Sequence, residues 1–251
     1  MVIKLLKCYN RFLINFKYYK TDKSNCNHGG ELKMIKIGYK PLVALALAVL
    51  MSLVAVSAVP AGNQGNTIYI DDSGSGLIPD GPTNCYIINE SGKYLLNESL
   101  THGIKIIAND VTLDGNGYNL TNSIAFGVQV YNCSDVTVKD MDIFGCNWAG
   151  IALGEASDCM VVKNCVTDCG KAWGTPGINL WGSVYNKIIN NYVYNNTGCG
   201  IKANDIANVE SERSMYNKIH ANTVFENPLG DICVNESVND VSGNHVTPEE
   251  E

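Results

Sequence analysis

The side chains best suited to binding chemistry are the three tryptophans of the chain, Trp148, Trp173 and Trp181, which lie close together in the sequence. Flat indole faces are surfaces against which sugar rings stack. The grouping predicts a carbohydrate platform, with an alternative in which the rings form a hydrophobic clasp over the molecule, because large aromatic side chains also serve packing. We therefore treat the three tryptophans as candidate ligand-binding residues.

Carboxylates are the second group able to do chemistry. Glycoside hydrolysis uses two carboxylates at a fixed separation, and Asp140, Asp168 and Lys171 are the weak catalytic candidates of this chain. The repeat described below aligns Asp140 with Lys163 and Asn190 rather than with a second acid. The sequence therefore offers no obvious carboxylate pair.

Metal ligands are scattered. The chain has no Cys-x-x-Cys pair, and His102, His220 and His245 lie far apart in the sequence. Zinc and copper sites need three or four convergent ligands of suitable softness. No metal and no cofactor are expected.

Eight cysteines follow residue 61, an even number that allows disulfides in an exported protein, although several could instead be small buried hydrophobic residues. The export is consistent with six Asn-x-Ser/Thr sequons, which predict glycosylation in a host that has the machinery. These sequons lie at Asn89, Asn97, Asn119, Asn132, Asn195 and Asn235.

Residues 34–61 have the pattern of a targeting segment. An apolar run at 42–56 follows Lys36 and Lys40 and precedes small residues at Ala58 and Ala61. This pattern predicts a helical signal peptide and a secreted or cell-surface protein. An uncleaved anchor is the alternative, and the one route to the membrane. Residues 1–33 are expected to be an upstream extension outside the fold, with translation starting at Met34.

Charge narrows the partners further. Residues 62–251 carry nine basic and 23 acidic side chains, a net charge of −14, and Arg213 is the one arginine among them. Nucleic acid binding by a basic face requires clustered lysine and arginine. The sequence therefore argues against a nucleic acid partner.

The elements that must position these side chains form a repeat. An aliphatic residue, usually an asparagine three places later, and a hydrophobic residue two places after that recur six times, with first members 25, 23, 27, 31 and 22 residues apart. The phrases are Leu113/Asn116/Tyr118, Val138/Met141/Ile143, Val161/Asn164/Val166, Ile188/Asn191/Val193, Ile219/Asn222/Val224 and Val241/Asn244/Val246. Such a period predicts an all-β solenoid of about six to seven coils. Its repeats occupy 109–246, after N-terminal cap strands in 62–108 and before an acidic tail at 247–251.

The asparagine of each phrase is expected at a bend, because asparagine tolerates the left-handed backbone region and its amide can bond to the amide one coil away. The predicted ladder consists of Asn116, Asn164, Asn191, Asn222 and Asn244, interrupted at Met141. The same register makes Cys146 and Cys169 neighbours on adjacent coils. We expect either a disulfide or a stack of two thiols there.

The segment 109–117, NDVTLDGNG, together with the repeats, resembles the NosD-like right-handed parallel β-helix proteins of the carbohydrate-binding and sugar-hydrolase type, especially those of archaeal cell surfaces. The resemblance covers about residues 66–246 and implies a right-handed parallel β-helix. The same coil hosts lyases, hydrolases, epimerases, adhesins and maturation factors, so the fold alone assigns no activity. The copper association of the NosD name is not carried over, because no cluster of methionine and histidine suits copper.

The leading hypothesis is a secreted or surface module that binds glycans or cell-envelope components without turnover. The alternative is a polysaccharide lyase or glycoside hydrolase that acts on an acidic or neutral glycan near Asp140, Asp168, Lys171 and Trp173, and calcium is implied only under the lyase alternative. The last coil has no visible cap, and open strand edges invite pairing, so a partner at this end is a further hypothesis.

Overall fold

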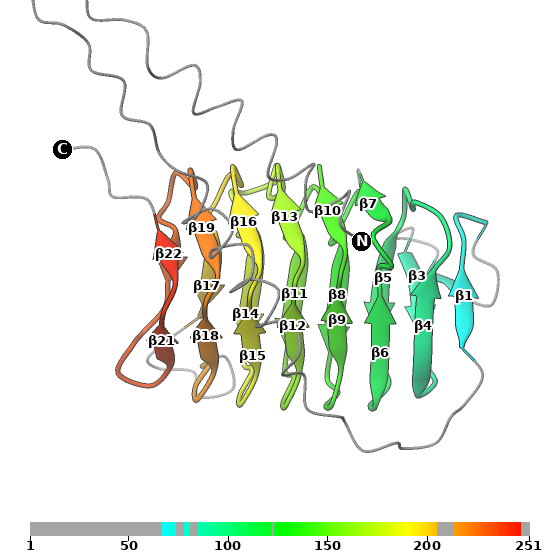
Figure 1. Cartoon of the computed structure of the whole chain (residues 1–251), viewed down its shortest axis with the longest axis horizontal. Coiled ribbons are helices and arrows are strands. Elements are labelled where there is room, and N and C mark those ends of the chain that lie inside the picture. Colours follow the sequence, from blue (N-terminus) through cyan, green and yellow to red (C-terminus); the bar gives the residue numbers. More distant parts are fainter. Residues whose placement is uncertain (1–66, 74–77, 81–84, 122, 205–212, 247–251) are drawn as a thin grey trace, which may run out of the picture. The chain divides into compact units, whose positions relative to one another are not determined.

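A computed structural model describes residues 67–73, 78–80, 85–121, 123–204 and 213–246 of the 251-residue chain (Figure 1). The predicted extension at 1–33, the signal peptide at 34–61 and the acidic tail at 247–251 lie outside these residues. Strands and turns make up the described segments, which contain no helix. It follows that no membrane-spanning helix is found among them.

Three sheets run along the molecule (Figure 1). Sheet A contains β1 (Ile68–Ile70), β4 (Gly92–Leu96), β6 (Val111–Asp114), β9 (Thr137–Lys139), β12 (Met160–Val162), β15 (Lys187–Ile189), β18 (Lys218–His220) and β21 (Asp240–Ser242), in that order. Sheet B contains β2 (Ile78–Asp80), β3 (Cys85–Ile88), β5 (Gly103–Ile106), β8 (Val128–Tyr131), β11 (Ile151–Gly154), β14 (Ile178–Trp181), β17 (Ile201–Ala203) and β20 (Ile232–Cys233). Sheet C contains β7 (Asn119–Thr121), β10 (Asp142–Phe144), β13 (Cys165–Thr167), β16 (Tyr192–Tyr194), β19 (Thr223–Phe225) and β22 (His245–Val246).

Each coil passes from sheet B to sheet A to sheet C and then returns to sheet B one level further along. The strands β8, β9 and β10 form one such coil, and β11 pairs in parallel with β8 at the start of the next. The hairpin-like pair β2 and β3 is antiparallel. The predicted fold class is confirmed as an all-β, right-handed-type parallel solenoid of about seven turns.

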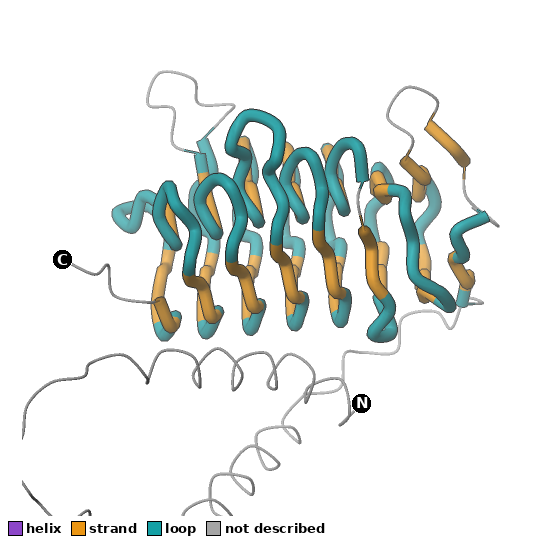
Figure 2. Tube along the Cα trace, turned by 90° about the horizontal axis from the view of Figure 1, so that it is seen from above, coloured by secondary structure: helices purple, strands orange, loops and turns teal. Residues whose placement is uncertain are grey.

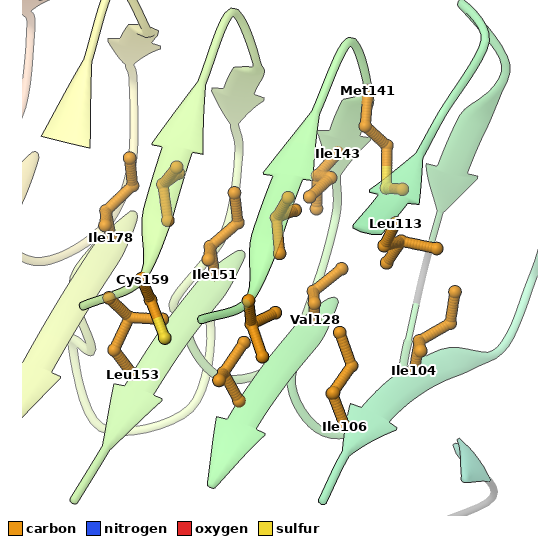
Figure 3. Packing of buried hydrophobic residues seen from close by; sticks show 14 of the residues in the cluster. Ile104, Ile106, Leu113, Val128, Met141, Ile143, Ile151, Leu153, Cys159 and Ile178 are labelled. Atoms are coloured by element: carbon orange, nitrogen blue, oxygen red, sulfur yellow. The ribbon is translucent and has the colours of Figure 1, made fainter. Parts of the chain in front are cut away.

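Alternation along each short strand places one set of side chains inside the coil. In β11, Ile151 and Leu153 are fully buried and join the hydrophobic core. Figure 3 shows core side chains such as Ile104, Val128 and Ile151 repeating from coil to coil. A single strand of three or four residues cannot bury its inner face alone, so stacking supplies the core.

The bends between sheets A and C that come after Asn116 follow one rule. The residue that adopts the left-handed backbone is the one before the asparagine, as at Lys163 (φ 58°) and Asn190 (φ 56°). The prediction that the ladder asparagines themselves occupy the left-handed region is therefore wrong for Asn164 and Asn191. The turning residue points outward, which leaves the next residue free to point inside the coil.

The inward amides form a continuous ladder along this corner. Asn164 Nδ2 donates to Asn191 Oδ1 at 3.1 Å, Asn191 Nδ2 to Asn222 Oδ1 at 3.0 Å, and Asn222 Nδ2 to Asn244 Oδ1 at 3.0 Å. Each Oδ1 also accepts the backbone N–H one coil back, as Asn191 Oδ1 does from Asn164 N at 3.0 Å. Buried amides are thus satisfied without water.

Asn116 does not belong to this ladder, contrary to expectation. Its Nδ2 donates to the carbonyl of Leu96 at 3.3 Å, and its own backbone is left-handed. The cause is a corner two residues longer than the others, because Leu120, and not Tyr118, pairs with Ile143. Met141 ends the ladder, where its backbone N–H donates to Asn164 Oδ1 at 3.3 Å.

The two other corners carry ladders of their own. Between sheets B and A, Asn186 Nδ2 donates to Asn217 Oδ1, and Asn217 Nδ2 donates to Asn239 Oδ1, each at 3.0 Å. Between sheets C and B, Asn196 Nδ2 donates to Asn227 Oδ1 at 3.1 Å. Figure 2 shows the result: strands stay aligned from coil to coil while the connecting loops project by different amounts.

Cysteines replace asparagine at three of these inward positions, and one of them is Cys159, whose backbone N–H donates to Asn186 Oδ1 at the corner between sheets B and A. Cys146 and Cys169 precede Asn196 at the corner between sheets C and B, and both are buried free thiols, so no disulfide joins them. The hydrogen bond between the two thiols, together with burial, holds the pKa of Cys169 well above its usual range. The one disulfide among the described residues links Cys199 to Cys233, whose Cα atoms lie 6.2 Å apart.

Candidate functional site

Two of the three tryptophans meet on the outer face of sheet B. Trp148 lies at the corner before β11 and contacts Phe126 edge-on, with ring centroids 4.9 Å apart. Trp181 ends β14 and stacks on the same Phe126 at 6.0 Å with an interplanar angle of 25°. We call Phe126, Trp148 and Trp181 the aromatic cluster.

Small residues of β11 provide the floor for this cluster. The outward positions of this strand are Ala152 and Gly154, and a Cβ atom on Gly154 would come within 2.2 Å of Trp181 Cζ2. Ala152 is completely buried although its side chain points away from the core. The rings therefore lie against the sheet, and Trp148 stays 41% exposed.

Polar groups border the cluster along the same face. Asn179, two positions before Trp181 in β14, carries a buried Oδ1 that has no hydrogen-bond partner. On either side in the register lie Ala152 and the exposed Lys202. An unpartnered buried acceptor costs stability unless something donates to it.

Trp173 is placed differently from the other two tryptophans. It is 93% exposed, and its backbone is left-handed with a φ of 67°. Within the described residues no ring contact links it to the aromatic cluster. Its loop is nevertheless anchored beside Trp148, because Gly170 N donates to the Trp148 carbonyl at 2.9 Å and Ala172 N to that of Asn147 at 2.7 Å. Trp173 is thus an exposed indole on a loop that backbone hydrogen bonds hold in place.

The structure does not bring the candidate catalytic residues together. Asp140 precedes the sheet C strand β10, whereas Asp168 follows the sheet C strand β13. Asp168 accepts a hydrogen bond from Asn195 Nδ2, and Lys171 is exposed in the loop that follows. No carboxylate pair results from this placement.

Asp140 takes part in a charge cluster instead. Lys139 Nζ donates to Asp114 Oδ2 at 2.6 Å and to Asp140 Oδ2 at 3.2 Å. Burial opposes the charge on Lys139, but these two hydrogen bonds prevail and raise its pKa. The cluster is a satisfied ion-pair network on the outer face of sheet A.

The sequon asparagines are all within the described residues. Asn89, Asn97, Asn132 and Asn195 are exposed, while Asn119 and Asn235 are half-buried. Asn235 Oδ1 accepts bonds from the backbone and hydroxyl of Ser237, its own sequon residue.

Donors that would suit a copper ion do not converge. His102 Nδ1 lies 3.3 Å from Asp72 Oδ1, His220 Nδ1 lies 3.2 Å from Ser242 Oγ, and Met141 is buried in the core. In the described segments no group of three or more histidine, cysteine, aspartate or glutamate side chains is arranged to hold a metal ion. The residues present do not fit a copper site.

Phe126 is the member of the cluster that sequence reasoning missed. It lies outside the repeated phrase, immediately before Gly127, which precedes β8. The usable signal was the pair of small outward residues, Ala152 and Gly154, in a strand whose neighbours carry large side chains at the same positions. Small outward residues indicate that something else covers that part of the sheet.

A protein-family model described as periplasmic copper-binding protein (NosD) matches residues 59–246. No curated protein sequence matches the chain.

Three solved structures illustrate the likeness to known β-helices. A periplasmic alginate epimerase is 14% identical with a TM-score of 0.43, over 65% of this chain and 45% of that one. The A-module of a mannuronan C-5 epimerase from Azotobacter vinelandii is 18% identical with a TM-score of 0.43, over 62% and 52%. A pectate lyase is 13% identical with a TM-score of 0.41, over 73% and 67%. The chain spans about half the length of the two epimerases, and nothing about its own ligands follows from these resemblances.

Proposed function

Because the chain belongs to the NosD family, whose description as periplasmic suggests an extracytoplasmic location, we propose that it is an extracytoplasmic module that binds glycan chains on sheet B without turnover. The observation that carries the proposal is the aromatic cluster with the free ring of Trp173 anchored beside it. The copper in the family's description is not part of the proposal, because the donors described above do not fit it.

Exposure supports binding over packing. Trp173 contributes no burial to the fold at 93% exposure, and Trp148 leaves 41% of its surface uncovered. Indole surface held in place at the surface of an exported protein suits the apolar face of a pyranose ring, while its edge seeks hydrogen bonds. Asn179 and Lys202 offer an amide and an ammonium on the same face.

The acids support binding over turnover. Glycoside hydrolysis needs two carboxylates that flank one bond, and the outward row of sheet B around the cluster consists of Lys105, Gln129, Ala152, Asn179 and Lys202. That row supplies no acid. Glu155, which follows Gly154 beside the cluster, accepts a hydrogen bond from the Tyr131 hydroxyl at 3.1 Å. Asp140 and Asp168, the candidates of the lyase or hydrolase alternative, border different ends of sheet C.

The test is binding of the intact exported chain to an array of neutral and acidic oligosaccharides. Each oligosaccharide that the chain binds is then titrated by calorimetry. Trp148→Ala, Trp181→Ala and Trp173→Ala should each weaken affinity about three- to tenfold, since one aromatic stacking contact contributes on the order of 0.5–1.5 kcal/mol. Tyr69→Ala is the matched control, because Tyr69 is 57% exposed on sheet A at the far end of the molecule.

Two results would contradict the proposal. Tryptophan variants that bind like the wild type, but unfold at lower urea concentration, would make the cluster a clasp. New unsaturated or reducing ends on a recovered oligosaccharide would replace binding by turnover.

A further inference from the structure

A second exposed aromatic feature lies at the corner between sheets B and A. Tyr185 and Tyr216 occupy equivalent positions on adjacent coils, with ring centroids 5.2 Å apart and an interplanar angle of 13°. Both side chains are more than half exposed, at 54% and 58%. This pair is on a different corner from the aromatic cluster, and nothing in the proposed function uses it.

The backbone does not favour tyrosine at this corner. Both residues are left-handed, with φ of 60° and 59°, and earlier coils place aspartate at the equivalent positions, Asp110, Asp135 and Asp158. Aspartate and asparagine tolerate this conformation, whereas bulky residues are outliers in it. Neither local backbone preference nor burial in the core therefore accounts for two tyrosines here.

Two lysines accompany the tyrosines. The sequence Tyr-Asn-Lys occurs in both coils, so that the asparagine points into the ladder and the tyrosine and lysine both point out. Lys187 and Lys218 are exposed and directly opposite each other in the register of β15 and β18. The four side chains form a two-by-two array whose spacing across the coils is about 4.8 Å, the distance between neighbouring strands.

Like charges directly opposite on neighbouring strands destabilise a sheet. Lys218 has a long contact with Asp240, 4.0 Å between Nζ and Oδ2, at an exposed position where such pairs contribute little. Within the described residues Lys187 takes part in no ion pair. Asp158 lies one coil before Tyr185, Met160 pairs with Lys187, and the Val238 carbonyl accepts from Tyr216 N.

From this arrangement we infer that Tyr185, Tyr216, Lys187 and Lys218 form a binding site for an acidic glycan, with carboxylates at the two ammonium groups and sugar rings against the tyrosines. An anion at this point offsets the lysine repulsion, and the exposed rings gain apolar contact. Asp158 and Asp240 repel carboxylates that run beyond the array, which limits the site to a few sugar units.

The experiment is calorimetric titration of the intact chain with a six-unit oligogalacturonate, and with a neutral maltohexaose of equal length. We expect binding of the acidic probe at low ionic strength, at least tenfold weaker binding at about 0.5 M salt because charges are then screened, and no binding of the neutral probe at this site. Lys187→Gln/Lys218→Gln should weaken binding of the acidic probe roughly tenfold or more. The control Lys93→Gln/Lys163→Gln removes the same charge elsewhere and should bind like the wild type.

A second pair of variants separates binding from stability. Tyr185→Asn/Tyr216→Asn removes the rings with a residue that accepts the left-handed backbone, so the fold is kept while affinity falls at least threefold. Unchanged affinity in this variant would mean that the rings only stack on each other and would overturn the inference. A loss in Lys187→Gln/Lys218→Gln that is as large for the neutral probe as for the acidic one, binding of a sulfated but not a carboxylated probe, or no binding of the acidic probe would overturn it as well.

Failure of this corner site can be distinguished from failure of the proposed glycan site on sheet B. Trp148→Ala should leave the oligogalacturonate affinity of the corner site unchanged. A chain that binds no neutral glycan through its tryptophans can still bind the acidic probe through Lys187 and Lys218, and the reverse outcome is equally readable.

Discussion

Trp181 lies so closely against the backbone of Gly154 that a Cβ atom at residue 154 would come within 2.2 Å of its Cζ2 atom. The Trp181 ring can therefore take this position only because residue 154, on the neighbouring coil, has no side chain. Phe126 stacks on Trp181 with ring centroids 6.0 Å apart, so a shift of Trp181 also moves Phe126.

Gly154→Ala should consequently move the Trp181 ring off the sheet. We expect a shift in tryptophan fluorescence and a loss of glycan affinity similar to that of Trp181→Ala. The free energy of unfolding should fall by about 1–3 kcal/mol, as is usual for overpacking. An unchanged emission spectrum would mean that the ring has room the structure does not show. Ala152→Gly, on the same strand and face, is the control that adds no atom.

Asn191→Ala should break the ladder between sheets A and C. It removes the acceptor of both Asn164 N and Asn164 Nδ2, and leaves the carbonyl of Val161 without its 2.9 Å partner. Each buried group left unpaired costs about 1–3 kcal/mol. Urea unfolding should show a loss of at least about 3 kcal/mol by that count. Asn190→Ala is the matched control, since alanine stands at the equivalent corner position, Ala221, in the next coil; an equal loss there would contradict the ladder's role.

Stability should fall at alkaline pH through the buried thiols. Burial raises the pKa of the Cys159 thiol to about 12, and burial also raises that of Cys133. The unfolded chain loses these protons near the ordinary thiol pKa of about 8.5, while the folded protein retains them. The contribution to stability is complete below that pH and is lost as the pH rises toward 12. Urea midpoints measured from pH 8 to pH 11 should decline, less steeply in Cys159→Ala, and a flat profile would contradict the burial of these thiols.

Reduction of the Cys199–Cys233 disulfide should loosen the C-terminal coils. The bond closes a loop with a sequence separation of 34 between strands β17 and β20. Loss of a disulfide of this loop length typically destabilises a protein by about 2–4 kcal/mol. Cys199→Ser/Cys233→Ser should unfold at lower temperature, and the wild type with reductant should match it. Cys146→Ala serves as the control, whose midpoint should still respond to reductant.

The sequence predicted the parts of the fold that follow from period and side-chain pattern. The register of Asp142, Cys165 and Tyr192 follows from the repeat, because each lies directly before a buried aliphatic residue of the phrase. The longer corner at 115–118 escaped prediction, since Asn116 and Met141 share the same offset from Leu113 and Val138. Only the pairing of Leu120 with Ile143 reveals the two extra residues.

The candidate site was less accessible to sequence reasoning. The repeat predicts which residues face outward but not how far a side chain leans along the sheet, and Phe126 and Trp181 meet across two coils. Trp173 depends on backbone bonds between its loop and the Trp148 segment, which no local pattern records. Pairing of Cys199 with Cys233 likewise depends on how the chain leaves the repeat near its end.

The left-handed corner residue has a consequence for how such a molecule can change over time. At the regular corners of the repeat, two consecutive residues have separate roles: one points inside and fixes the winding, and the left-handed one before it meets the solvent. Aspartate at Asp158 and tyrosine at Tyr185 occupy the same solvent-facing position without altering the coil behind them. Substitutions at this position can therefore change the surface of one coil while the backbone of the solenoid stays the same. Proteins of this architecture can thus share a backbone while recognising unrelated molecules.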